Sequence, residues 1–171
     1  ALNWDTINLA SGISVTMTDD QNDLIGTAAG TNAVSISDVS TSIVADALVE
    51  SYVLLGAGAN DITLTADAQG VTTAVDATNQ SVDTSTLTTI SGAYVGNATS
   101  TDILDITTTS TNISTATGLT AALNWDTINL ASGISVTMTA AQAALIGTAP
   151  GTEQVTVTDA ITEEETLNAA V

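Results

Sequence analysis

Apolar and polar residues alternate in several short stretches of the chain, and Thr fills many of the polar positions. An alternation with a period of two places the apolar side chains on one face of a β-strand. Val, Ile and Thr also have branched side chains, which suit a pleated surface. The pattern therefore predicts a mainly β protein, with strands centred near Val15, Ile36, Ile62, Leu87, Ile106, Ile128 and Val157.

Short helical patterns follow two of these strands. Thr18-x-x-Gln21 and Thr139-x-x-Gln142 fit the capping box, in which two side chains satisfy free amides at the start of a helix. Gly26 and Gly147 are typical of the residue at which a helix ends. We expect short helices near residues 19–25 and 140–146, and further ones near residues 40–49 and 66–70.

The chain contains a repeat of 121 residues. Residues 1–18 and 122–139 are identical in sequence, and 29 of the first 41 aligned positions carry the same residue. Residues 1–121 therefore make one full period, and residues 122–171 begin a second copy. One period and part of the next suggest a processed product or a window cut from a longer array.

The spacing of the predicted strands indicates how they are connected. Their centres lie mostly about 20 to 26 residues apart, which is the length of one rung of a solenoid. Connections of this length favour parallel strands, and hairpin signals such as Asn-Gly and Asp-Gly are nearly absent. We expect a mainly parallel β-solenoid of 20–26-residue rungs with short flanking helices. Tandem β-sandwich domains are the alternative, because they also explain a period of about 120 residues.

Charge and composition exclude most functional classes. The 171 residues include 19 Asp and Glu but no Lys, Arg, His or Cys, which gives a formal net charge of −19. Such a chain cannot neutralise phosphates, so we expect no nucleic-acid binding, and anionic membranes would repel it. No apolar run is long enough for membrane insertion. Histidine bases, thiolates and lysines are missing, so only a carboxylate pair remains for catalysis, and we expect no enzyme.

Two segments, around residues 34–70 and 122–160, are similar to a known group of proteins. Residues 34–69 read VSISDVSTSIVADALVESYVLLGAGANDITLTADAQ. This order resembles a repeat of large secreted bacterial proteins, the RTX-type adhesins and surface-layer proteins, in which a V-T-V-S-D strand precedes an Ala/Leu segment, I-T-L-T and an Ala/Gln segment. The resemblance implies one-step export, an extracellular or cell-surface location and dependence on calcium. The calcium-binding nonapeptide of that group, G-G-x-G-x-D-x-U-x, has a single imperfect copy at residues 56–62.

Oxygen-bearing side chains form three groups of candidate calcium ligands, since Ca²⁺ binds carboxylate and amide oxygens. The groups are a cluster at a predicted helix start, the imperfect nonapeptide with a nearby acid, and a pair in a predicted strand: Asp19, Asp20 and Asp23; Asn60, Asp61 and Asp67; Asp102 and Asp105. Each group also has an explanation without metal, namely a favourable helix dipole, a turn, or charges that guard a sheet edge. The second copy replaces the first cluster with Ala140, Ala141 and Ala144, so the fold does not need those charges.

Three other features have competing interpretations. Trp4 and Trp125 occupy equivalent positions, where an anchor in the core at a rung corner is favoured over ligand contact. Glu163-Glu164-Glu165 is interpreted as a solvated run or as the boundary of a module. Thr-x-Thr occurs at residues 16–18, 63–65, 137–139 and 156–158, as in ice-binding solenoids, although Thr is also an ordinary surface residue of strands.

The combined expectation is a structural repeat module of an extracellular surface layer, filament or adhesin stalk. It would self-associate into a filament or lattice through stacked β rungs, with calcium bridging carboxylates that otherwise repel one another. The alternative is an adhesin module that recognises ice or carbohydrate through Thr-rich β faces.

Overall fold

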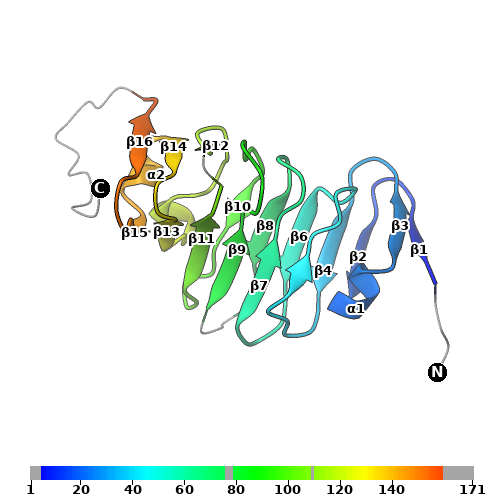
Figure 1. The fold of residues 1–171 in the computed structure, drawn as a ribbon. Coiled ribbons are helices and arrows are strands. Elements are labelled where there is room, and N and C mark those ends of the chain that lie inside the picture. The colour runs from blue at the N-terminus through cyan, green and yellow to red at the C-terminus, as the bar shows by residue number, and fades with distance from the viewer. Residues whose placement is uncertain (1–4, 76–78, 109, 160–171) are drawn as a thin grey trace.

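The chain forms a β-solenoid of about eight turns, stacked along one axis from the N-terminal end to the C-terminal end (Figure 1). The structure is a computed structural model that describes residues 5–75, 79–108 and 110–159. Every strand pair in this part of the chain is parallel. The predicted parallel solenoid is therefore confirmed. The β-sandwich alternative is wrong, because a sandwich needs antiparallel hairpins.

Two long sheets run along the solenoid and two shorter ones complete it. The first long sheet contains β2 (Ser14–Met17), β4 (Ala33–Ile36), β6 (Ser51–Leu54), β8 (Gly70–Thr73) and β10 (Tyr94–Val95). The second contains β5 (Ile43–Val44), β7 (Asn60–Thr63), β9 (Gln80–Asp83), β11 (Asp102–Ile106), β13 (Thr127–Leu130) and β15 (Ile146–Thr148). The shorter sheets are β1 (Ile7–Leu9) with β3 (Ile25–Ala28), and β12 (Ser110–Asn112) with β14 (Ser135–Met138) and β16 (Gln154–Val157).

The turns differ in length along the chain. Residues in register lie 18 positions apart from Ile7 to Ile25 but 25 apart from Thr111 to Val136. The longer turns lie in the middle of the chain, and their added residues form a third side that begins with the bridge between Thr89 and Asn112. The predicted rung length is close to this range. Each described turn holds about two strands, however, whereas the sequence pattern suggested about one.

A ladder of apolar side chains fills the interior. In the second long sheet the inward residues of successive turns stack directly on one another, in the order Ile43, Ile62, Val82, Leu104, Ile128 and Ile146. All six are essentially inaccessible to solvent. Full burial of one such side chain contributes about 1.5–3 kcal/mol, so each turn stabilises its neighbours.

Two single-turn helices follow β2 and β14, as predicted. They are α1 (Asp19–Asn22) and α2 (Ala140–Ala143), and both begin with a complete capping box. In the first, the Gln21 amide donates to Thr18 Oγ1 (3.3 Å) and the Thr18 amide donates to Gln21 Oε1 (3.0 Å). A 3₁₀ helix, η1 (Ala121–Leu123), precedes β13.

Several local predictions are wrong. Residues 40–49 and 66–70 form no helix; the first range contains β5 and a turn, and the second a turn that leads into β8. Leu87 lies in a connection after β9 instead of a strand. These segments are too short for their periodicity to distinguish helix from strand.

Gly26 and Gly147 do not end the helices. They lie in β3 and β15, and the helices end at Asp23 and Ala144. A Cβ atom at Gly26 would lie 2.4 Å from Cγ2 of Thr6, and one at Gly147 would lie 2.4 Å from Cγ2 of Thr127. The glycines are therefore required by close contact with the preceding turn.

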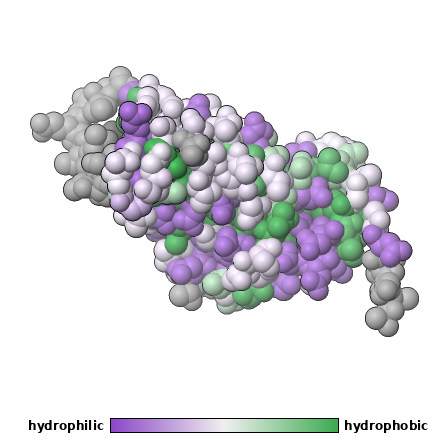
Figure 2. Space-filling view, viewed as in Figure 1, coloured by the Kyte–Doolittle hydropathy of each residue, from purple (hydrophilic) through white to green (hydrophobic). Residues whose placement is uncertain are grey.

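Polar, neutral and apolar residues are interspersed on the face shown in Figure 2, where the hydrophobic groups are small and separate. None of the helices in the described ranges is long and apolar enough to cross a membrane.

Candidate functional site

The helix α1 brings the first predicted cluster together. Asp19 and Asp20 lie in its only turn, and Asp23 is the residue that ends it. The pKa of Asp23 is raised by partial burial and by the carboxylates of Asp19 and Asp20. The three charges are therefore close enough to repel one another, and a bound cation would relieve that repulsion.

Asp19 is already held by the next turn. Its Oδ2 accepts a hydrogen bond from Ser40 Oγ (2.7 Å), and its backbone amide donates to Asp38 Oδ1 (2.9 Å). Its Oδ1 is buried without a hydrogen-bond partner. Within the described residues, no three acidic side chains are arranged to hold a metal ion. Because Ca²⁺ also takes backbone oxygens and water, calcium at this cluster stays a prediction.

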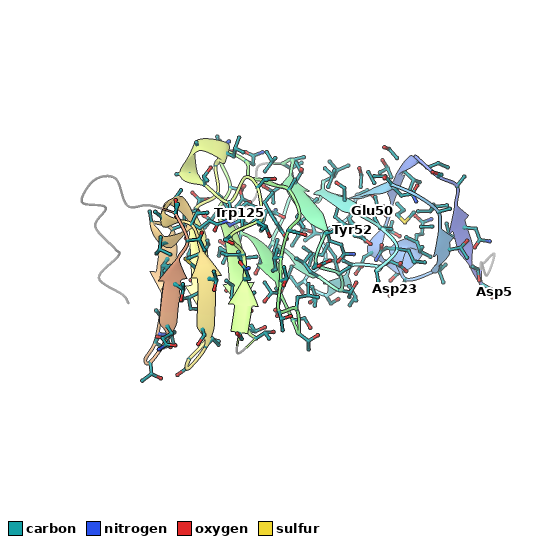
Figure 3. The ribbon with its side chains drawn as sticks, turned by 90° about the horizontal axis from the view of Figure 1, so that it is seen from above. Asp5, Asp23, Glu50, Tyr52 and Trp125 are labelled. Carbon is teal, nitrogen blue, oxygen red and sulfur yellow. The ribbon has the colours of Figure 1, made fainter. Side chains whose placement is uncertain are left out.

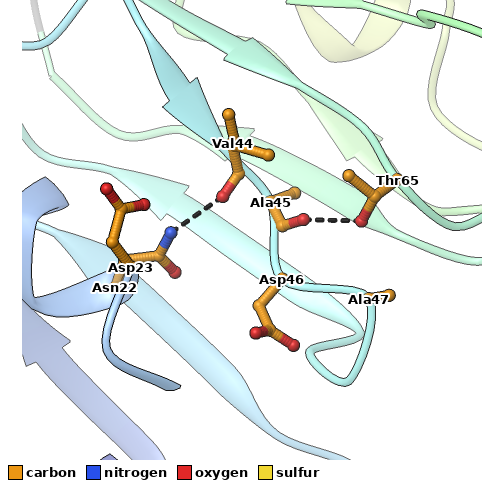
Figure 4. A pocket seen from close by; sticks show the side chains of 7 residues that line it. All are labelled: Asn22, Asp23, Val44, Ala45, Asp46, Ala47 and Thr65. Carbon is orange, nitrogen blue, oxygen red and sulfur yellow. Dashed lines mark hydrogen bonds between the residues drawn. The ribbon is translucent and has the colours of Figure 1, made fainter. Parts of the chain in front are cut away.

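A hollow of about 310 Å³ lies beside α1, between two neighbouring turns (Figure 4). Asp23 and Asp46 each bring a carboxylate to it. Asn22 donates from Nδ2 to the Val44 carbonyl (2.8 Å) and accepts a bond from the Tyr52 hydroxyl (3.0 Å). Burial raises the pKa of Tyr52, so this hydroxyl stays protonated and joins the turns. The hollow is open, and its lining is more apolar than polar.

The imperfect nonapeptide forms a hydrogen-bonded corner. Asn60 is buried, and its Nδ2 donates to the carbonyls of Gly56 (2.7 Å) and Gly58 (3.1 Å) and to Gln80 Oε1 (3.1 Å). Its Oδ1 accepts from the Ser40 amide (3.0 Å). Both polar atoms of the Asn60 side chain therefore have hydrogen-bond partners within the protein, which favours the structural interpretation of this residue.

A buried polar ladder continues from this corner along the solenoid. Asn60, Gln80 and Asp102 are in register at the starts of β7, β9 and β11, and all three are buried. Burial raises the pKa of Asp102, although its Oδ2 accepts from the Asn97 amide (2.7 Å). Sequence reasoning missed Gln80. The sequence feature that could have identified it is a polar residue directly before the alternating apolar stretch, which recurs in each of these turns.

Asp102 and Asp105 do not form a pair. Burial alternates along β11, so Asp102 points into the solenoid and Asp105 points out. The interpretation of Asp102 as a solvated charge at a sheet edge is therefore wrong. Asp105 instead accepts hydrogen bonds from Ser81 Oγ (2.8 Å) and Asn129 Nδ2 (2.9 Å).

Asp105 belongs to an acidic strip on the outer face of the second long sheet, made of Asp61, Asp83 and Asp105. Asp83 and Asp105 are register neighbours on β9 and β11. The pKa of Asp61 is raised by burial first and then by the charges of Asp83 and Asp105. Asp83, Asp105 and Thr148 also line a hollow of about 380 Å³. Sequence reasoning missed Asp83, because it did not place β9 in this sheet.

The remaining candidates lie elsewhere. Asp67 is exposed in the connection between β7 and β8, and its backbone carbonyl accepts from the Ser91 amide (2.7 Å). Trp125, which is labelled in Figure 3, is buried. Its ring meets that of Tyr94 edge-on, at 5.7 Å between ring centroids, which confirms its role as a core anchor. Trp4 and residues 163–165 lie outside the described residues.

The Thr-x-Thr pairs do not share one flat face. The outward row through Thr16 continues with Ser35, Val53, Thr72 and Val95. Thr63 lies in the other long sheet, and Thr18 and Thr139 cap the helices. Ice binding would need an unbroken row of Thr, and the outward row along β2 to β10 is interrupted by Ser and Val.

No protein-family model, curated protein or solved structure matches this chain. The similarity to RTX-type adhesins and surface-layer proteins therefore depends on the sequence pattern alone. What the geometry offers is a stiff stack of parallel turns with carboxylates along its outside.

Proposed function

We propose that this protein is a structural module of an extracellular surface layer, filament or adhesin stalk, which self-assembles through its stacked β turns. The observation that carries the proposal is the unbroken apolar ladder from Ile43 to Ile146. Each turn is stabilised mainly by the turns next to it, which makes the stack a stiff rod.

Charge is the main force against assembly. A formal charge of −19 makes the rods repel one another, and salt screens that repulsion beyond about 8–10 Å. Divalent cations near the acidic strip or the Asp19, Asp20 and Asp23 cluster would reduce it further. We therefore expect assembly to increase with calcium.

Electron microscopy of the purified protein, in calcium and after chelation, tests the proposal. Ordered filaments or lattices that dissolve on chelation would support a metal-bridged polymer. Order that survives chelation would keep the structural role and remove calcium from it. Separate particles under both conditions would contradict self-assembly by this chain and would favour an adhesin that works as a single rod.

A further inference from the structure

We propose that two copies of this chain pair side by side through the outer face of the first long sheet, which we name the neutral face. It consists of the outward residues of the three central strands β4, β6 and β8, namely Ala33, Ser35, Ser51, Val53, Gly70 and Thr72. The inference rests on the proposed function, because it names a surface through which the rods pair laterally.

Charge distinguishes the outer faces of the two long sheets. In the central strands β7, β9 and β11 of the second sheet, half of the outward positions are acidic, namely Asp61, Asp83 and Asp105. The neutral face has no ionisable side chain. Its outward row continues with Thr16 on β2 and Val95 on β10, which are also uncharged. A chain with a formal charge of −19 therefore keeps one face of a long sheet free of charge.

The second copy of the repeat keeps this property while its sequence changes. Ala33 and Ser35 of β4 correspond to Gln154 and Thr156 of β16, and both replacements are uncharged. Glu153 directly precedes β16 and stands where the first copy has an Asn. A charge is thus gained beside the outward row but not in it.

The neutral face is also regular. Ser35 lies opposite Val53, and Val53 lies opposite Thr72, without the register shift that interrupts the pairs β1–β3 and β13–β15. Its side chains are small or β-branched, so two such faces can approach closely. Paired sheets lie about 10 Å apart, and identical side chains between them can interdigitate without water.

The nearest acids in the sequence lie beyond the ends of these strands. Glu50 directly precedes β6, and its Oε2 accepts a hydrogen bond from the Asn32 amide (2.7 Å). Asp38 follows β4, and its Oδ1 accepts from the Asp19 amide (2.9 Å). Backbone amides of the preceding turn thus hold both carboxylates, and a second copy on the neutral face would leave them at the rim of the contact.

The charge of the chain indicates that the occupant of this face is a second copy. Because the sequence has no Lys, Arg or His, a contact between copies gains no ion pair between side chains. An acid buried in such a contact would lose its water without gaining an opposite charge, which is strongly unfavourable. A basic partner would be attracted to the acidic strip instead. Two neutral faces present the same surface to each other, so their contact closes as a twofold dimer.

The size of the face sets the strength of the contact. Five strands about 4.8 Å apart, with four residues of about 3.3 Å each, give a footprint of roughly 300 Å². Stable complexes bury about 800 Å² on each partner. We therefore expect a weak dimer of single molecules, with a dissociation constant on the order of 0.1–1 mM.

Two variants with the same added charge test the contact. Val53 on β6 and Thr63 on β7 are both half-buried and point outward, but they lie in different long sheets. The full chain is examined by sedimentation equilibrium up to about 1 mM, with chelator and about 0.5 M salt to screen the net charge. The wild type and Thr63→Asp are expected to form dimers. Val53→Asp, folded by circular dichroism, is expected to weaken the dimer more than about tenfold, because both copies bring the charge to the contact.

Single cysteines show which face is used. The chain has no Cys, so Val53→Cys and Thr63→Cys each carry one thiol. A short bis-maleimide should join two copies of Val53→Cys and leave Thr63→Cys largely unjoined at the same concentration. In dilute solution, a simple maleimide should label both thiols at similar rates. Slow labelling of Val53→Cys that dilution does not change would mean that the face is covered within the molecule, and it would overturn the contact.

The remaining outcomes distinguish the inference from the function beneath it. Dimers that persist in folded Val53→Asp, or equal crosslinking from both faces, would overturn the neutral-face contact and leave the structural role in place. The same holds for a wild type that stays monomeric at about 1 mM with chelator but forms filaments in calcium. A wild type that stays monomeric and forms no ordered assembly in calcium would overturn both proposals.

Discussion

The same substitution in the two copies should have unequal costs. Ile134→Ala removes a side chain that is 2% exposed, and Ile13→Ala removes its equivalent, which is 37% exposed. Burial of a whole Ile side chain contributes about 1.5–3 kcal/mol, and the cavity that its loss leaves raises the cost to about 2–4 kcal/mol. At Ile13 water already reaches the side chain and can fill the space, so we expect about 1 kcal/mol there.

Urea unfolding of both variants measures this difference, at low salt and with chelator so that the molecules stay separate. The free energy of unfolding should fall by at least about 1 kcal/mol more for Ile134→Ala than for Ile13→Ala. Equal costs would refute the reasoning, because they would mean that the difference in exposure between Ile13 and Ile134 does not set the cost.

Three other predictions follow from particular contacts. Gly147→Ala should lower the free energy of unfolding by about 1–3 kcal/mol, because the added Cβ clashes with Thr127 Cγ2. Thr127→Ser removes that methyl group and should restore most of the lost stability in the double variant. Equal losses with and without Thr127→Ser would contradict the clash. Asp102→Asn should be neutral or stabilising at pH 7 because it keeps an acceptor for the Asn97 amide, whereas Asp102→Ala should cost about 1–3 kcal/mol in the same urea assay. The pKa values of Asp23, Asp61 and Asp102 lie above their ordinary value of 3.8 in the folded chain, so the native state binds more protons just above that pH. The melting temperature should therefore rise as the pH falls from 7 toward 4 and decline as the pH rises through these pKa values, and a flat or opposite profile would contradict the burial of these groups.

The sequence predicted the architecture better than the number of strands. The alternation of apolar and polar residues around Val15, Ile62 and Ile128 was enough to identify strands. The near absence of hairpin signals indicated that these strands are parallel. Strands such as β5 and β10 have only two residues, too few for a period to be seen. Their pairing depends on neighbouring turns about 20 residues away, which no local pattern records.

The candidate ligands show the same limit. Asp19, Asp20 and Asp23 are close in the sequence, and α1 keeps them close in space. The acidic strip was only partly predictable, because Asp83 joins Asp61 and Asp105 through the register of three strands. For Asp102 the sequence left a metal ligand and a solvated edge charge open, because its place in β11 was not known. A shift of one residue along a strand exchanges inside and outside.

The residues that the two copies share indicate which positions the stacking of turns requires. Ile7, Val15 and Gln21 recur unchanged as Ile128, Val136 and Gln142, and in the second copy all three contact the turn below.

Asp19, Asp20 and Asp23 become Ala at the same positions, which removes three negative charges while the helix and its capping box remain. Asn22, which becomes Ala143, is explained by its hydrogen bond with Tyr52, two turns along the chain from α1. Stacking is thus encoded by the inward rows and the capping glutamine. The outer charge is free to vary, and it can set how strongly neighbouring rods repel one another or attract cations.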